Sequence, residues 1–382
     1  MKHFNFLLFS FFLFLSITSC TLIDDERNRY ELLNERDARV LLSEKDSENI
    51  TIVNRKQFNN IIFSAEKIAR INLNNNNFNE IDFSYAELNE VTFNGSDFKH
   101  IDFSHATLVN VSFRGASISD AIFNDAKLIN VTFEHTTINN SQFNNTLFFN
   151  DKLSFVKIKN SSLLNTQMEK SKISNSEFYY STIKHSKFNN LSIKQTQFTG
   201  SKISYSDFSH SNLSNSDFRT AQIDSSSFIS STLNNSNFSK SELNNLNFSH
   251  AIAIGSRFER AKISNGNFDN ADFRETRFLE THISNSSFIK SNLEFSIFEF
   301  AELSNCNISK SIISRTNFKR ASLSNCDLSN TKAKWSNFIM TTLNNTNFSF
   351  SDVHKADFRG AHLNKVIFKG ALNFKNIIGL EN

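Results

Sequence analysis

The sequence of 382 residues contains no proline and only eight glycines. Proline cannot donate a backbone hydrogen bond, so its absence fits a chain in which neighbouring segments are hydrogen-bonded at most positions. The three cysteines and ten histidines form no zinc-type cluster, and there is neither a phosphate-cradling Gly motif nor a calcium loop. Because no nucleophile, base and orienting group recur together, we expect no enzymatic activity, metal, cofactor or small-molecule substrate.

A large excess of charge of one sign is also absent. The chain has 41 Lys and Arg against 38 Asp and Glu, a formal net charge of +3. Residues 24–50 hold nine acidic and five basic side chains, so residues 51–382 carry a formal +6. This charge is dilute over a long surface and forms no basic stripe, so we do not expect nucleic-acid binding.

What the sequence does contain is an apolar residue at every fifth position from Phe58 to Phe368. Of these 63 central positions, 31 are Phe, 15 Leu and 13 Ile. An α-helix repeats its faces at 3.6 residues and a strand at 2, so the backbone must instead turn a corner every five residues. A small residue, such as Ala106 or Ser206, lies two positions before nearly every centre. We expect both columns to point toward the axis of the molecule.

Central residues taken in steps of twenty form chemically uniform columns. One column, from Phe178 to Phe358, is ten consecutive Phe. This uniformity predicts stacked coils of twenty residues, about 16 in all, in which each side chain lies on its equivalent in the next coil. The column from Asn245 to Asn345 predicts an asparagine ladder at a corner, because Asn tolerates left-handed backbone and stacked amides can bond each other.

The five-residue motif of a small residue, a polar residue, a central Leu or Phe and two polar residues resembles the pentapeptide repeat family. Residues 106–110 and 236–240 are good matches, and the resemblance covers residues 58–370. It implies an all-β fold, a right-handed quadrilateral β-helix with four pentapeptides per coil. It also implies two further properties: some members mimic DNA with an acidic surface and bind type II topoisomerases, and some dimerise through the carboxyl end.

The amino terminus has a different character. Lys2 precedes an apolar run over residues 4–15, which is too short for a stable membrane anchor and indicates a secretion signal over residues 1–19. The sequence Ile-Thr-Ser-Cys that ends at Cys20 looks like the lipobox of bacterial lipoproteins, so Cys20 is the expected lipidation site. The alternative is an uncleaved apolar helix with an incidental Cys. Thr21 stands where Asp would suggest inner-membrane retention, so the resemblance favours the outer membrane.

The two ends of a solenoid expose unpaired edges and need caps. Residues 20–57 are expected to form the lipidated amino terminus, a linker and a helical cap. Residues 371–382, where the repeat loses its register at Asn373, are expected to close the carboxyl end, in competition with dimerisation of two copies there. Five residues are spaced for one face of the short amphipathic helix: Tyr30, Leu33, Asp37, Val40 and Leu41.

Two cysteines form a candidate disulfide. Cys306 and Cys326 are twenty residues apart in the small inward column, so stacked coils place them side by side. A strand spacing of about 4.8 Å lies within the Cα separation that a disulfide allows, and an exported protein meets oxidising conditions. The alternative is that Cys acts as a small apolar filler, like the Ala and Ser that it replaces.

Six outward corner residues form a candidate protein-binding patch. Aromatic rings interleaved with Arg are enriched at protein interfaces. The alternative is that the rings fold over the corner to cover local defects, such as the small centre Ala333. The patch has two columns: Phe295, Arg315 and Trp335 in one, and Phe300, Arg320 and Met340 in the next.

These observations predict a non-enzymatic, lipid-anchored envelope protein. Its rigid rod would serve as a scaffold, a spacer or a binding surface for a protein partner whose identity the sequence does not reveal. The alternative implied by the resemblance is a DNA mimic that binds or protects a type II topoisomerase. The positive charge of the rod and the export signal both oppose this alternative.

Overall fold

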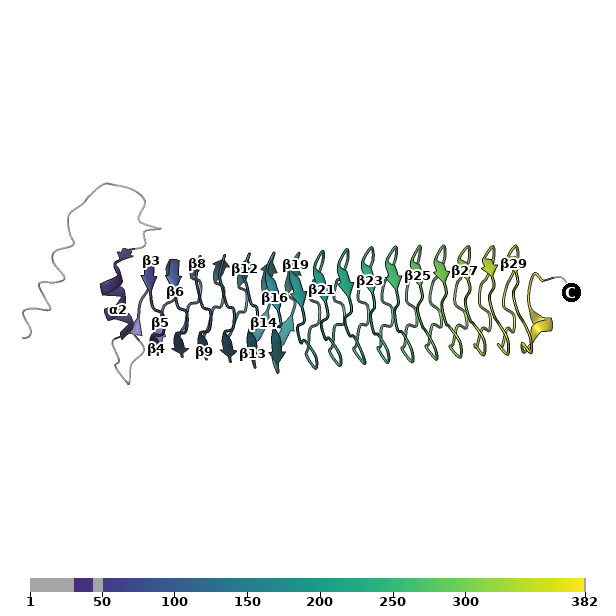
Figure 1. Cartoon of the computed structure of the whole chain (residues 1–382), viewed down its shortest axis with the longest axis horizontal. Coiled ribbons are helices and arrows are strands. Elements are labelled where there is room, and N and C mark those ends of the chain that lie inside the picture. The colour runs from purple at the N-terminus through teal and green to yellow at the C-terminus, as the bar shows by residue number, and fades with distance from the viewer. Residues whose placement is uncertain (1–30, 44–50, 381–382) are drawn as a thin grey trace, which may run out of the picture.

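The chain winds into a straight rod of stacked coils, a β-solenoid of about 15 turns (Figure 1). The computed structural model describes residues 31–43 and 51–380, and one predicted site, Cys20, lies outside them. From residue 51 onward, each strand pairs in parallel with the strand twenty residues away, as in the pairing of Phe58 with Phe78, whereas the first strand pairs Leu33 with Phe58. The same register holds at the other end, where Leu343 pairs with Leu363. The predicted all-β solenoid with a twenty-residue coil and a short amino-terminal helix is therefore confirmed.

The strands form ladders that run along the rod. The first half of the rod holds an eight-stranded ladder of β1 (Glu31–Leu33), β3 (Lys56–Ile62), β6 (Asn77–Asp82), β8 (Asp97–Lys99), β10 (Ser117–Ser119), β12 (Thr137–Asn139), β15 (Lys157–Lys159) and β19 (Glu177–Tyr179). A second ladder comprises β4 (Lys67–Ala69), β7 (Glu87–Asn89), β9 (Thr107–Val109), β11 (Lys127–Ile129), β13 (Leu147–Phe149) and β17 (Gln167–Glu169). Two strand pairs complete this half: β2 (Thr51–Ile52) with β5 (Ile71–Asn72), and β14 (Lys152–Ser154) with β18 (Lys172–Ser174).

The second half of the rod is built on one eleven-stranded ladder. Isolated parallel bridges at the same spacing of twenty residues join the other faces of these coils. The ladder comprises β16 (Ser162–Leu164), β20 (Thr182–Lys184), β21 (Lys202–Ser204), β22 (Gln222–Asp224), β23 (Glu242–Asn244), β24 (Lys262–Ser264), β25 (His282–Ser284), β26 (Glu302–Ser304), β27 (Ser322–Ser324), β28 (Thr342–Asn344) and β29 (His362–Asn364).

Stacked side chains fill the axis of the rod. The rings of Phe218 and Phe238 stack with their centroids 4.6 Å apart and their planes 1° apart. Across the axis, Phe218 meets Phe228 edge to face at 6.0 Å, an arrangement that aromatic pairs favour. Both kinds of contact follow from the predicted columns, because residues twenty apart are stacked and residues ten apart face each other.

The corners are left-handed turns. Asn245 has a φ of 53°, and the residue at the equivalent corner of nearly every pentad lies in the same region. This conformation costs most residues about 1–2 kcal/mol, which makes Asn a suitable corner residue. The predicted asparagine ladder is present: Asn305 donates its side-chain amide to Asn285 at 3.1 Å and accepts one from Asn325 at 3.1 Å.

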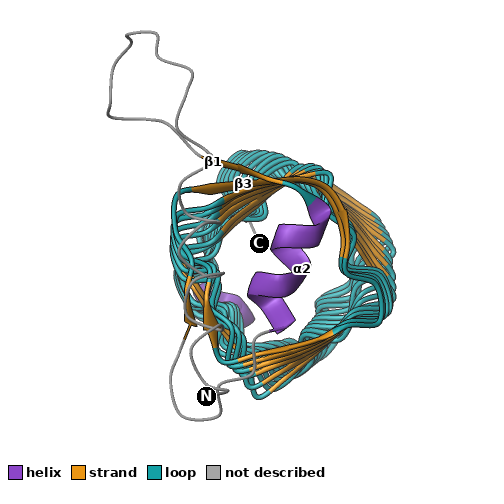
Figure 2. Cartoon of the chain, turned by 90° about the vertical axis from the view of Figure 1, so that its left-hand side faces the viewer, coloured by secondary structure: helices purple, strands orange, loops and turns teal. Residues whose placement is uncertain are grey.

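Helix α2 (Glu35–Ser43) lies across the amino-terminal opening of the solenoid (Figure 2). The side chain of Asn34 accepts a hydrogen bond from the backbone of Asp37 at 2.9 Å, which starts the helix. Ala38 and Leu42 form its buried face. The helix therefore covers the core of the first coil, as a cap should.

The predicted face of this helix was wrong in part. Asp37 is exposed and Val40 is 51% exposed, although both were assigned to the buried face. The physical reason is that Leu33 belongs to β1, where its pairing with Phe58 fixes its orientation, and the helical phase starts only after it. Leu41 is partly buried as expected, whereas Tyr30 lies outside the described residues.

Within the described residues, no helix has the length and apolar character needed to cross a membrane.

The last described segment remains hydrogen-bonded to the preceding coil, and its role as a cap stays a prediction. The backbone of Leu372 bonds to Ser351, and that of Ile378 bonds to Ala356, both at 2.9 Å. The repeat changes at Asn373, which has a φ of 58° and precedes the short 3-10 helix η1 (Phe374–Asn376). Ala371, Ile377 and Leu380 pack against the core, while Phe374 and Ile378 remain 40% and 42% exposed. Dimerisation of two copies at this end stays a prediction.

Candidate functional site

The first column of the patch is a stack of two rings with a guanidinium group between them. The Cζ atom of Arg315 lies 5.4 Å from the ring centroid of Phe295 and 4.7 Å from that of Trp335. Glu294 holds the same guanidinium group at 3.3 Å. His354 contacts Trp335 edge to face at 5.7 Å. These contacts orient the Trp ring while leaving 45% of it exposed.

The second column lies at the next corner of the coil. The Cζ atom of Arg320 lies 5.5 Å from the ring centroid of Phe300, and Met340 follows in the next coil. Phe300 is 44% exposed and Met340 is 52% exposed. Ala333, the small central residue named in the alternative explanation of the patch, is fully buried within the core. The two columns thus present partly exposed aromatic and sulfur-containing side chains on neighbouring corners.

The two cysteines are neighbours in adjacent coils, where both are buried free thiols. The Sγ atom of each lies near the backbone carbonyl of a core residue in the preceding coil, Ile283 for Cys306 and Leu303 for Cys326, at 3.6 Å in both cases. The hydrogen bond with Cys306, together with burial, raises the pKa of the Cys326 thiol. The bond between the two sulfur atoms stays a prediction.

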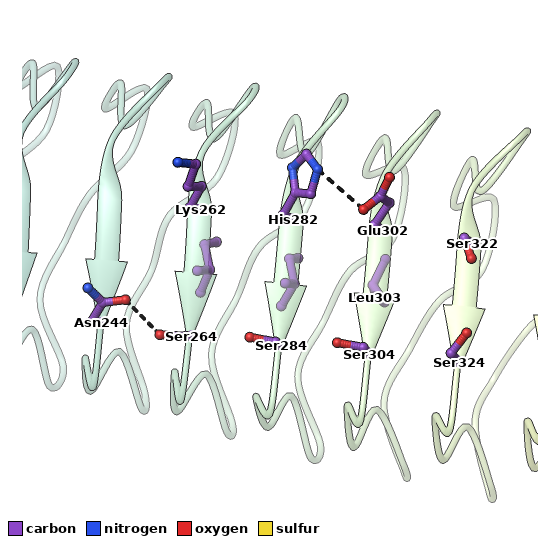
Figure 3. A pocket seen from close by; sticks show the side chains of 12 residues that line it. Asn244, Lys262, Ser264, His282, Ser284, Glu302, Leu303, Ser304, Ser322 and Ser324 are labelled. Carbon is purple, nitrogen blue, oxygen red and sulfur yellow. Dashed lines mark hydrogen bonds and ion pairs between the residues drawn. The ribbon is translucent and has the colours of Figure 1, made fainter.

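A shallow groove of about 440 Å³ runs along the outer face of β23 to β27 (Figure 3). Sequence reasoning missed it, because the repeat predicts which residues face outward but not where their side chains leave a recess. Each strand contributes one outward residue before its buried centre and one after it. The larger row contains Lys262, His282 and Glu302, and the smaller row is a run of four serines: Ser264, Ser284, Ser304 and Ser324.

A buried carboxyl group was also missed. Asp151 is 1% exposed and occupies the small inward column, between Val131 and Ser171 of the adjacent coils. Burial raises the pKa of Asp151 to about 8, although hydrogen bonds from the backbone of Val131 and Phe149 oppose the shift. The sequence signal was available, since an acidic residue stands where the column otherwise carries small or apolar residues.

The described residues contain no group of three or more His, Cys, Asp or Glu arranged to hold a metal ion. The features with unusual exposure or burial are the patch, the groove, the thiol pair and Asp151. Together with the filled axis, they define a β-solenoid rod whose distinctive residues, apart from the thiol pair and Asp151, lie on its outer faces.

Comparison with known families agrees with this class. The sequence matches the description "Pentapeptide repeat region" over residues 66–143. It also matches "Pentapeptide repeats (8 copies)" in overlapping segments between residues 192 and 371. The matched segments cover more than half of the chain, which therefore belongs to the pentapeptide repeat family.

Similar solved structures include other pentapeptide repeat proteins. HetL, which is involved in heterocyst differentiation regulation in the cyanobacterium Nostoc, is 17% identical, with 53% of this chain and 90% of HetL covered and a TM-score of 0.27. QnrB1, a plasmid-mediated fluoroquinolone resistance protein, is 17% identical, with 51% of this chain and 90% of QnrB1 covered and a TM-score of 0.23. A search of the curated proteins finds no match.

Proposed function

We propose that this protein is a non-enzymatic, lipid-anchored component of the bacterial envelope, with outer-membrane attachment favoured. Cys20 would carry the lipid, and the rod would serve as a rigid scaffold that presents a protein-binding surface. A solenoid suits this role because each coil is held by its neighbours, so a surface site keeps a fixed position along the rod.

The observation that carries the protein-binding proposal is the stack of Phe295, Arg315 and Trp335. Its two rings keep 48% and 45% of their surface exposed, although they contact the same guanidinium group. Trp, Tyr and Arg supply much of the binding energy at protein interfaces. Rings that are already oriented lose less conformational freedom when a partner covers them. The stack therefore supports a preformed contact surface.

The test is crosslinking in the native envelope, comparing the wild-type chain with a variant in which Phe295, Phe300 and Trp335 are changed to Ser. We expect the fold to be preserved and specific crosslinked species to disappear. The matched control changes Tyr85, Tyr180 and Tyr205 to Ser, which removes three exposed rings at corners elsewhere on the rod. Equal crosslinking patterns for the wild type and the patch variant would contradict the proposal.

The rival function is topoisomerase binding by DNA mimicry. Such a mimic needs an unbalanced acidic surface, whereas several acidic side chains on this rod are paired with basic ones in the adjacent coil. Glu87 binds Lys67 at 2.9 Å, and Glu280 binds Arg260 at 2.7 Å. Fractionation with a radiolabelled fatty acid separates the two functions: the envelope proposal expects a labelled membrane protein whose label is lost in Cys20→Ser. An unlabelled cytoplasmic product would favour the mimic.

A further inference from the structure

The groove over β24 to β27 has the form and chemistry of a site for an extended polar chain. Its lining extends from Asn244 to Ser324, which is four coil-to-coil steps. At a strand spacing of about 4.8 Å, this corresponds to about 19 Å along the rod. The groove is open along its length (Figure 3). A linear ligand could therefore lie parallel to the axis and meet the same type of side chain at each step.

Hydrogen-bonding capacity on the floor of the groove is largely unused. The hydroxyl group of Ser264 donates to Asn244 at 2.6 Å. By contrast, the hydroxyl groups of Ser284, Ser304 and Ser324 have no partner among the described residues. A hydroxyl group can donate one hydrogen bond and accept two. These three side chains therefore offer a row of donors and acceptors at the spacing of the coils.

The one lysine in the groove lining is compensated by an acidic neighbour. Lys262 pairs with Glu242 at 3.6 Å, and Glu302 pairs with the Nε2 atom of His282 at 3.2 Å. An anionic polymer would need uncompensated Lys or Arg side chains, which this groove lacks. The charge balance therefore favours an uncharged ligand.

The backbone of this face is already paired. Strands β24 to β27 are interior members of the eleven-stranded ladder, each hydrogen-bonded on both sides. A peptide that binds as an added strand needs an unpaired sheet edge. Only side chains remain to recognise the ligand, which favours a polymer rich in its own hydroxyl groups over a peptide strand.

An exposed aromatic residue occupies the corner that precedes β26. Phe300 is the corner residue two positions before Glu302, and it is 44% exposed. An exposed ring beside polar side chains offers one apolar surface within a polar site, which suits the apolar face of a sugar ring. We propose that the groove binds a neutral, extended oligosaccharide, with the serine hydroxyl groups, His282 and Glu302 as its hydrogen-bonding partners. This proposal does not require protein binding at the patch, although Phe300 belongs to both sites.

The test is calorimetric titration of the full-length chain, purified in a detergent without a sugar headgroup. The probes are hexasaccharides of β-1,4-linked glucose and β-1,4-linked N-acetylglucosamine, with hexagalacturonate as the anionic comparison. We expect saturable binding of at least one neutral hexasaccharide. Ser284→Lys places a long side chain in the groove and should weaken this binding by about tenfold or more. Ser304→Lys provides a second, independent obstruction.

The matched control is Ser204→Lys, at the same position of β21, four coils away and outside the groove. It should bind the hexasaccharide as the wild type does. The proposal would be overturned by the absence of binding to both neutral probes, by tighter binding of hexagalacturonate, or by equal affinity in the wild type and both groove variants. The two groove variants leave every patch residue in place, so sugar binding and protein crosslinking can be lost separately.

Discussion

Asp151 accepts a 2.6 Å hydrogen bond from the backbone N–H of Val131 in the preceding coil. Its other carboxylate oxygen, Oδ2, is buried and has no partner among the described residues. The adjacent coil contributes the hydroxyl group of Ser171, which accepts a bond from the backbone of Asp151 at 3.1 Å. An ionised carboxylate at this position would be buried with one of its two oxygens unsatisfied, which is costly, so the fold favours the protonated form of Asp151.

Replacing Asp151 with Ser should stabilise the rod, and more at high pH than at low pH. Burial raises the pKa of Asp151 from 3.8 to about 8, so between these values the folded chain binds more protons than the unfolded chain. The free energy of unfolding must then fall as the pH rises through this window and level off above it. The shift corresponds to a loss on the order of 5 kcal/mol.

Urea unfolding at pH 4 and at pH 9 measures this difference. We expect the advantage of Asp151→Ser over the wild type to grow by several kcal/mol between the two pH values. Parallel pH profiles for Asp151→Ser and the wild type would show that the buried carboxyl group does not ionise in this range.

The sequence predicts the axis of this fold better than its surface or its ends. With a strict period of five, the Phe residues are all buried only if the chain winds into a coil with a corner in every pentad. The stacking of Phe218 on Phe238 then follows from their spacing of twenty residues. The asparagine ladder was predictable for the same reason. The buried face of α2 was not predictable in this way. Leu33 belongs to the strand before the helix, where its pairing with Phe58 fixes its orientation, so it cannot be used to count helical positions.

The candidate sites were predictable to different degrees. The positions of the patch residues follow directly from the twenty-residue coil, since corner residues in equivalent pentads must stack. The exposure of Trp335 and the placement of the Arg315 guanidinium group depend on side-chain rotamers, which the repeat does not fix. The groove arises because the Ser side chains are shorter than their neighbours. Such a recess depends on the sizes of side chains in several coils at once, which the five-residue motif does not specify.

Replacing Arg315 with Ala should make Trp335 more accessible to a collisional quencher. The guanidinium group lies 4.7 Å from the ring and covers part of one face. Trp335 is the only Trp of the chain, so its fluorescence reports this site alone. The loss of stability should be small, about 0.5–1 kcal/mol, because the pair is partly exposed.

The matched control for this experiment is Arg320→Ala. Arg320 stacks on Phe300 at the next corner, so its loss should leave the quenching of Trp335 unchanged. Equal acrylamide quenching constants for the wild type and Arg315→Ala would mean that the guanidinium group does not cover the ring in solution.

Replacing Asn305 with Ala should destabilise the rod by about 2–3 kcal/mol, because the corner loses two amide hydrogen bonds and keeps a left-handed backbone. Replacing Asn305 with Gly loses the same bonds with the amides of Asn285 and Asn325 but removes the steric cost. We therefore expect the Gly variant to be more stable than the Ala variant by about 1 kcal/mol in urea unfolding. Equal stabilities would show that the amide ladder alone, and not the backbone conformation, selects Asn.

The thiols of Cys306 and Cys326 should resist labelling in the folded chain and react after unfolding. Each side chain is 2% exposed, so a labelling reagent does not reach either sulfur atom in the folded chain. Labelling in guanidinium without reductant should detect two more thiols in the wild type than in a Cys306→Ser, Cys326→Ser variant. Because Cys20 is common to both chains, it cancels from the difference. If the wild type shows no more labelled thiols than the variant before reduction and two more after it, Cys306 and Cys326 form a disulfide. Their adjacent positions would then serve a covalent bond and not packing alone.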